Sequence, residues 1–237
     1  MRLLVTRPEP DASIFAEELR GLGNEPVLQP LIEFRVLEFD VEPLRAAEVL
    51  IITSGNSLRA LQERGVIKDI HAKPLYCVGE QTAQRALAAG FETVLEVAHT
   101  GEDLARKIIA SGRRGALLVH IMGEHMAFDI VGALAREGFS VQSATVYSMD
   151  ARREFSPSVA AMLKAGEIDG VILMSPRTAE IYVSLCHTHG IIDCDKTPIY
   201  LCLSENVAAK LAPLKPNHVR VPVKPNRKAL LELLHAD

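Results

Sequence analysis

Small polar residues follow several apolar segments of the chain, and the stretch IITSGNS at residues 51–57 is the clearest case. It places Thr53, Ser54 and Asn56 between an apolar run and a helix-like segment. Hydroxyl and amide groups beside the free N–H groups of a helix start can bind carboxylates or phosphates. The same residue types are also preferred helix N-caps, so one such turn by itself is more typical of capping than of binding.

Comparable polar turns recur along the chain. They are Thr6-Arg7-Pro8, Gly79-Glu80-Gln81-Thr82, Met122-Gly123-Glu124, Ser175-Pro176 and Ser204-Glu205-Asn206. As a group they are rich in hydroxyl groups and glycine and poor in charge. Several helix starts that converge on one place suit a ligand with several carboxylates or phosphates, so the whole set favours a binding site.

Apolar runs that resemble buried strands alternate with segments of helical periodicity. The runs are RLLVT, EVLIITS, PLYCVG, ETVLEV, ALLVHI, DGVILMS, PIYLCLS and HVRVPV. Stretches between them, such as DASIFAEELRGLG and GEDLARKIIASG, have apolar residues at three- and four-residue spacing and stop at glycine. This alternation predicts parallel βα units, in which ligands bind outside the carboxyl ends of the strands, where the polar turns lie.

The sequence also contains an internal repeat. EVLIITSGNSLRAL parallels DGVILMSPRTAEIY, and PLYCVGEQTAQRAL parallels PIYLCLSENVAAKL. The second copy lacks the last βαβ segment of the first, and the nearest match to that segment is the N-terminus, RLLVTRPEPDASIFAEELRGLGNEPVLQPLIEF. The second copy is therefore expected to be completed from the front of the chain.

The repeat predicts two flavodoxin-like α/β domains, each with a mainly parallel, five-stranded sheet. One domain is inserted, at about residues 38–145, and the other is discontinuous, made of residues 1–35 and 150–237. The chain crosses between them near residues 30–38 and 143–151, and these β-favouring segments are expected to pair as a two-stranded hinge. The polar turns of both domains would then line one shared cleft, the default binding site.

Composition restricts the functional class. Hydrophobic residues make up 48% of the chain and charged residues 24%, and the formal net charge is −4 without a run of Lys and Arg. This argues against a nucleic-acid-binding protein. A secretory leader and an apolar run of the roughly 18 residues that span a membrane are both missing, which favours a cytoplasmic protein. The cysteines, Cys77, Cys186, Cys194 and Cys202, are expected to be reduced and buried.

Several motifs together resemble the uroporphyrinogen-III synthase family. They are LLVTRP at the N-terminus, ITSGNS, YCVGEQTA, VYS at the second crossover and ILMSPRTAEIY, and the resemblance covers nearly the whole chain. It implies a lyase that cyclises the linear tetrapyrrole hydroxymethylbilane to uroporphyrinogen III, with loss of water and inversion of the last pyrrole ring. The substrate carries eight carboxylates and no metal or organic cofactor is needed. We expect a monomer, with hand-over of the substrate from the preceding bilane-forming enzyme.

The resemblance also implies roles for individual residues. Tyr147 matches the tyrosine that is most often implicated in the family, and we expect it to assist departure of the hydroxyl group. Carboxylate binding is expected from Thr53, Ser54, Asn56, Gly79, Thr82, Ser175 and Ser204, with Arg7 as the loop cation placed to pair with a carboxylate. Structural alternatives remain open: Tyr147 as a packed strand aromatic, Arg7 in a salt bridge within its own domain, and Ser204 as a helix cap.

Two positions depart from the family pattern. Met122 and Ser148 stand where many members have basic residues, so carboxylate binding on that side would depend on backbone N–H groups or be weaker. An inactive family member is therefore one alternative. The other is a non-catalytic, hinged binder of a small polyanion, which the same loops would also serve.

Metal and nucleotide motifs are weak. CHTHG at residues 186–190, taken with Cys194, lacks the regular ligand spacing of zinc sites. His120 and His125 are spaced for neither one helix face nor one strand face, so we do not expect them to bind a metal together. GLGNEP lacks the third glycine of a dinucleotide fingerprint and follows a helix.

Overall fold

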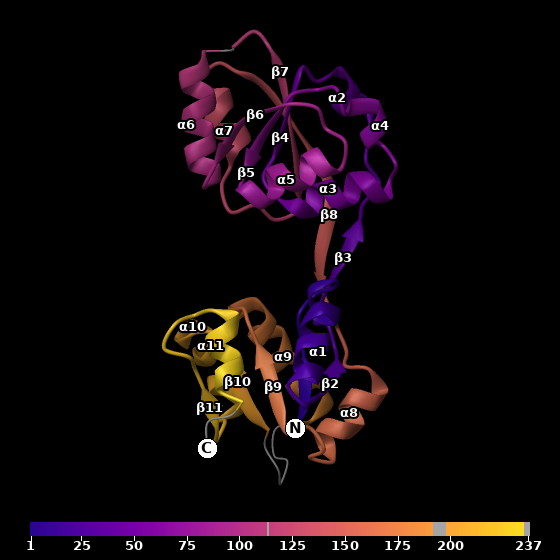
Figure 1. The fold of residues 1–237 in the computed structure, drawn as a ribbon, viewed down its shortest axis with the longest axis vertical. Helices are drawn as coiled ribbons and strands as arrows, with labels where there is room; N and C mark the ends of the chain where they lie inside the picture. Colours follow the sequence, from indigo (N-terminus) through magenta and orange to yellow (C-terminus); the bar gives the residue numbers. More distant parts are fainter. Residues whose placement is uncertain (113, 192–197, 235–237) are drawn as a thin grey trace. The chain divides into compact units, whose positions relative to one another are not determined.

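The computed structural model describes residues 1–112, 114–191 and 198–234 and shows an α/β protein with two parallel-rich sheets (Figure 1). The chain divides into two compact units, which we call unit 1 (residues 1–34 and 150–237) and unit 2 (residues 35–149). The expected α/β class with mainly parallel strands is confirmed.

Unit 1 contains a five-stranded sheet in the order β11-β10-β9-β1-β2, with every neighbouring pair parallel. The strands are β1 (Arg2–Val5), β2 (Glu25–Leu28), β9 (Gly170–Leu173), β10 (Ile199–Cys202) and β11 (Val219–Arg220). The helices are α1 (Asp11–Gly21), α8 (Pro157–Lys164), α9 (Pro176–His189), α10 (Glu205–Ala208) and α11 (Arg227–Glu232), with a 3₁₀ helix at Ala209–Leu214. Because alternate strand residues face opposite sides, Leu3 and Leu4 enter two different apolar cores, and both are fully buried.

Unit 2 is built around the strands β4 (Val49–Ile52), β5 (Leu75–Val78), β6 (Val94–Ala98), β7 (Leu117–Gly123) and β8 (Ser140–Ala151). Its helices are α2 (Glu42–Ala46), α3 (Gly55–Glu63), α4 (Ile67–Ile70), α5 (Glu80–Ala88), α6 (Gly101–Ser111) and α7 (Ile130–Arg136). Helices α6 and α7 cover one face of the sheet, where Val49, Ile51 and Leu118 pack against Leu104 and Ile130 (Figure 1).

The sheet that contains the unit 2 strands has six strands, in the order β3-β8-β7-β4-β5-β6, so the prediction of five was wrong. The additional strand is β3 (Ile32–Val36), part of the first crossover segment. Strand β8 is the last strand of the parallel part of the sheet and is longer than its neighbour β7. The other edge of β8 is therefore available to β3. The N–H of Leu37 donates to the carbonyl of Val146, and the N–H of Arg152 donates to that of Leu31. The two crossover segments therefore pair with each other, while their role as a hinge stays a prediction.

The two strand orders correspond. Relative to β9 and β10, the βαβ segment β1-α1-β2 takes the position that β7-α7-β8 takes relative to β4 and β5. This is the arrangement that the sequence repeat predicts, and it places β1 in the interior of its sheet although β1 begins the chain. Thr6 ties β1 to β9, because its buried hydroxyl donates to the carbonyl of Ile172 at 2.7 Å.

The described cysteines Cys77, Cys186 and Cys202 are free and buried, as expected, whereas Cys194 lies outside the described residues. Burial raises the pKa of the Cys77 and Cys202 thiols to about 12, so both are protonated and unreactive near neutral pH. Within the described ranges, none of the helices has the length and apolar character that a membrane crossing requires.

Candidate functional site

A pocket of about 380 Å³ lies at the carboxyl ends of the unit 2 strands. Thr53 and Ser54 after β4, Val78 at the end of β5, and Met122 and Gly123 at the end of β7 line it, together with Tyr147 of β8. The start of α6 and the loop at residues 125–128 close its remaining sides. In parallel sheets this edge is the usual place for a ligand.

Three of the predicted site residues, Thr53, Ser54 and Tyr147, meet in this pocket. Tyr147 is 8% exposed, and its ring lies directly against Gly123. A Cβ atom added to Gly123 would lie 2.5 Å from Cζ and 2.9 Å from the hydroxyl oxygen of Tyr147. The absence of a side chain at residue 123 is therefore what leaves room for the tyrosine ring.

The side chain of Thr53 contacts the buried imidazole of His120. Thr53 Oγ1 and His120 Nε2 lie 3.0 Å apart, and the imidazole is only 1% exposed. Burial lowers the pKa of His120 to about 4, although the carboxylate of Asp129 partly opposes this effect. This contact could not be predicted from the sequence, since a histidine within an apolar strand run indicates no partner.

The pocket wall is mostly apolar apart from its hydroxyl groups. Val78, Met122, Phe128 and Ile130 contribute the apolar surface, and His125 is the one imidazole among the described lining residues. Neither lysine nor arginine is found in that described lining. Met122, which is 6% exposed, supplies no charge to this wall. An anion bound here would therefore depend on hydroxyl and N–H donors.

The neighbouring predicted residues have structural partners of their own. Ser54 caps α3, because its hydroxyl oxygen accepts from the N–H of Asn56 at 3.2 Å. The amide Nδ2 of Asn56 lies 3.6 Å from Sδ of Met149. Gly79 has a φ of 83° at the start of α5, where glycine is favoured, and Thr82 is buried in the first turn. None of Asn56, Gly79 and Thr82 lines the described pocket.

Arg85 is a further cation near this edge, and it is not among the predicted site residues. It extends from α5 toward the start of α3, where its Nη1 would lie 2.7 Å from a Cβ atom on Gly55. Arg85 is exposed, and within the described part of the chain it forms no ion pair. It lies within a helical segment, one turn beyond the loop that starts the helix, so a search of the loops alone does not find it.

The remaining predicted residues belong to unit 1. Arg7 forms an ion pair with Asp11 at 2.6 Å, and its Nη1 lies 3.4 Å from Sδ of Met174. Ser175 caps α9 by accepting from the N–H of Thr178 at 3.1 Å. Ser204 precedes α10 but makes no side-chain capping bond, so the cap interpretation finds no support at this residue.

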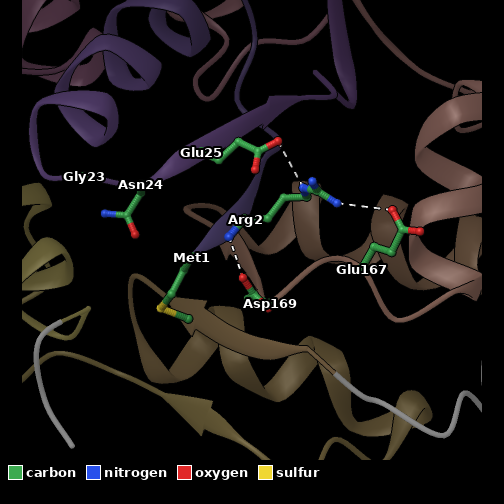
Figure 2. A pocket seen from close by; sticks show the side chains of 7 residues that line it. All are labelled: Met1, Arg2, Gly23, Asn24, Glu25, Glu167 and Asp169. Carbon is green, nitrogen blue, oxygen red and sulfur yellow. Dashed lines mark hydrogen bonds and ion pairs between the residues drawn. The ribbon is translucent and has the colours of Figure 1, made fainter.

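A second pocket, of about 510 Å³, lies at the opposite, amino-terminal ends of the unit 1 strands (Figure 2). Figure 2 shows Arg2 between Glu25 and Glu167, with ion pairs of 3.1 and 3.2 Å. The backbone N–H of Arg2 also donates to Asp169. These charges satisfy one another and the pocket contains none of the predicted residues, so it is the weaker candidate.

Similarities to known proteins extend over nearly the whole chain. The sequence profile of the family described as uroporphyrinogen-III synthase HemD matches residues 13–232. Comparison with curated protein sequences gives no match. The structure of uroporphyrinogen-III synthetase from Helicobacter pylori 26695 is similar, with a TM-score of 0.61, 17% identity, and coverage of 99% of this chain and 98% of that one.

A mutant uroporphyrinogen III synthase from the extremely thermophilic bacterium Thermus thermophilus is also similar, with a TM-score of 0.54 and 17% identity. The alignment covers 99% of this chain and 97% of that one. At this identity the solved structures establish a common fold, while the profile match extends over most of the chain and establishes the family. The chain therefore belongs to the uroporphyrinogen-III synthase family, whose members are hydro-lyases of haem biosynthesis.

Proposed function

We propose that this protein cyclises hydroxymethylbilane to uroporphyrinogen III, with loss of water and inversion of the last pyrrole ring. Family membership supports the reaction. The observation that supports a site in this chain is the meeting of Tyr147, Thr53 and Ser54 in one pocket at the carboxyl edge of the unit 2 sheet.

Tyr147 assists departure of the hydroxyl group in this proposal. Loss of hydroxide requires a proton, and a phenol that lines the pocket can donate one directly or through a water molecule. The fixed ring position against Gly123 supports such a role, because proton transfer requires a defined distance between donor and acceptor. The apolar wall formed by Met122 and Phe128 limits water around the reacting carbon.

Carboxylates of the substrate are bound mainly by uncharged donors. Thr53 and Ser54 contribute from inside the pocket, and Arg85 contributes the positive charge near its edge. The proposal retains Asn56, Gly79, Thr82, Ser175 and Ser204 as further donors in the polar turns of the two units. Arg7 joins them only by exchanging Asp11 for a substrate carboxylate, since the ion pair of 2.6 Å otherwise occupies it.

The reaction requires positioning and proton transfer alone, so the proposal includes neither a metal nor an organic cofactor. We place the enzyme in the cytoplasm as a monomer that receives its substrate from the preceding bilane-forming enzyme. The two crossover strands would act as the hinge that lets the turns of both units contact one substrate.

The decisive experiment supplies freshly made hydroxymethylbilane and separates isomers I and III of the product. The isomer III product is expected from the wild-type chain, whereas isomer I alone at the spontaneous rate would exclude the enzymatic function. Tight binding of hydroxymethylbilane without isomer III would instead support a non-catalytic binder or an inactive family member.

The role of Tyr147 is tested by Tyr147→Phe, which is expected to lower kcat about 100-fold or more. The matched control is Tyr76→Phe, because Tyr76 is buried in the core of the same unit and lies outside the described pocket lining. Wild-type turnover in Tyr147→Phe would assign this tyrosine to packing.

A further inference from the structure

His120 is a buried polar side chain to which the proposed reaction gives no role. It lies in β7 between Leu118 and Met122, and its strand register pairs it with Ile51. Alternate residues of a strand share one face, so His120 and Thr53 both lie on the side that α6 and α7 cover. There the Nε2 atom is 3.0 Å from the hydroxyl oxygen of Thr53.

The other ring nitrogen has no comparable contact. His120 Nδ1 is buried and has no hydrogen-bond partner among the described residues. Burial also lowers the pKa of the imidazole to about 4, so the ring is neutral near pH 7 and carries a single N–H. Which nitrogen carries this proton decides the direction of the hydrogen bond to Thr53.

The two tautomers have different costs. With the proton on Nδ1, a buried N–H donor remains without an acceptor, and the hydroxyl of Thr53 must donate to Nε2. With the proton on Nε2, the N–H donates to Thr53 and only a ring lone pair at Nδ1 stays unpaired. Buried N–H groups without partners are rarer in proteins than incompletely satisfied acceptors, which favours the proton on Nε2.

We propose that His120 is a positioning residue, held as the Nε2–H tautomer, which makes the hydroxyl of Thr53 a hydrogen-bond donor directed into the pocket. Because Nε2–H occupies a lone pair of Thr53 Oγ1, the proton of the hydroxyl is left for a ligand. The site thereby selects an acceptor such as a carboxylate and disfavours a donor group. The identity of the ligand as a substrate carboxylate rests on the proposed function.

The tautomer of His120 can be measured by NMR, without an activity assay. The wild-type chain labelled with ¹⁵N-histidine is studied by long-range ¹H–¹⁵N correlation spectra, and the His120 signals are identified by their loss in His120→Gln. We expect a protonated Nε2 and a bare Nδ1 that do not change between pH 6 and pH 8. A protonated Nδ1, or an imidazolium in this range, overturns the proposal even if the enzyme is active.

Kinetics test whether His120 acts through Thr53. His120→Phe keeps a ring without a donor, and Thr53→Val keeps the shape of the threonine without its hydroxyl. Each is expected to raise KM for hydroxymethylbilane about tenfold with little change in kcat, the size expected for one hydrogen bond to a charged group. The double variant is expected to match either single variant, because both remove the same interaction.

His120→Gln is the conservative variant, since its amide can donate from nearly the same position as Nε2–H, and it is expected to restore much of the lost affinity. Effects of His120→Phe and Thr53→Val that multiply, or a wild-type KM in His120→Phe, contradict the proposal. A wild-type chain that makes no isomer III refutes the proposed function instead, and the tautomer measurement then still judges the role of His120.

Discussion

At the scale of single residues, the buried His120 couples the stability of unit 2 to pH. Burial depresses its pKa to about 4, while an unfolded chain restores the ordinary value of 6.5. Between these values the unfolded chain binds more protons than the folded chain. As far as His120 determines it, the free energy of unfolding is therefore highest above pH 6.5 and falls as the pH is lowered toward 4.

We predict that this residue costs the wild-type chain about 3 kcal/mol of stability between pH 7 and pH 4. Urea unfolding at both pH values, compared with His120→Gln, isolates the effect because other titrating groups are common to the two proteins. His99→Gln, at an exposed histidine of the same unit, should retain the wild-type pH dependence. An equal pH dependence in His120→Gln and wild type would show that the buried imidazole is not the cause.

Ser148 and Ser57 form a matched pair of buried hydroxyl groups in unit 2. Ser148 is fully buried and its Oγ has no hydrogen-bond partner among the described residues. Ser57 is equally buried, but its hydroxyl donates to the carbonyl of Ile121 at 2.8 Å. We predict that Ser148→Ala leaves the free energy of unfolding unchanged or raises it slightly, whereas Ser57→Ala lowers it by about 1 kcal/mol.

Urea denaturation measures both serine variants, with the slope of the unfolding free energy against urea as a check that the unfolded state is unchanged. A loss in Ser148→Ala as large as that in Ser57→Ala would reveal a partner for the Ser148 hydroxyl.

The sequence predicts some residues of the pocket but not the contacts that they make. Thr53 could be predicted because it stands in a polar turn after a strand, where ligands bind in parallel sheets, whereas Tyr147 is indicated only by the family resemblance. The partner of Thr53 was not found, because the contact with His120 depends on the register of β4 against β7. A salt bridge of Arg7 within its own domain is one of the alternatives open from the sequence, and the structure identifies Asp11, four residues away, as the partner.

At the scale of elements, the ends of β7 and β8 fit together through Gly123 and Tyr147. The register between the two strands shifts at this point, after Met122 pairs with Thr145 and before Gly123 pairs with Tyr147. The irregularity brings the tyrosine ring over the glycine, and the pair forms one wall of the pocket.

We predict that Gly123→Ala displaces the ring of Tyr147 and lowers kcat for hydroxymethylbilane, because the new methyl group would lie 2.5 Å from ring carbon Cζ. A stability loss of about 1–3 kcal/mol is expected from the overpacking. Gly115→Ala is the control, since a Cβ atom there meets nothing within 4 Å. Full activity in Gly123→Ala would mean that the ring position does not matter for the reaction.

Most strands could be predicted from the sequence, because eight apolar runs with turn signals at their ends are a strong indication of buried parallel strands. The role of β3 could not be predicted in full. Residues 32–36 alternate in burial like a strand with one covered face, and pairing with the second crossover segment is expected, but the sequence does not show that this pair joins the inserted sheet. Because the long β8 belongs to the sheet and also pairs with β3, the strand pair expected at the crossover adds a sixth strand to that sheet.

At the scale of the whole molecule, the two units differ in how their chain is assembled. Unit 2 is continuous, whereas unit 1 combines residues 1–34 with residues 150–237. In unit 1, β1 pairs on one side with β2, from the same chain segment, and on the other side with β9, from the second segment. Neither segment alone therefore contains the complete sheet. That each unit folds as a domain remains a prediction. A fragment with all of unit 2 is expected to fold alone, whereas a fragment with only one segment of unit 1 is not.

We predict that residues 31–151, which keep β3 and all of β8, fold alone and unfold cooperatively with urea. Residues 150–237 alone are expected to stay unfolded, because the buried Leu3, Leu4 and Val5 of β1 are missing from their cores. Circular dichroism and the sharpness of the urea transition measure both fragments. A disordered 31–151 fragment would contradict the independence assigned to unit 2, and a folded 150–237 fragment would contradict the requirement of unit 1 for β1.

The interior position of β1 also has a consequence for synthesis on the ribosome. Residues 1–34 emerge before unit 2, yet their neighbour β9 begins only at Gly170, after all of unit 2 has been made. Contacts across such a sequence separation form late, so the inserted unit can fold while the first strand is still unpaired on that side. A nascent chain that stalls before residue 170 leaves the apolar β1 with an open edge, the kind of segment that chaperones bind and that otherwise aggregates.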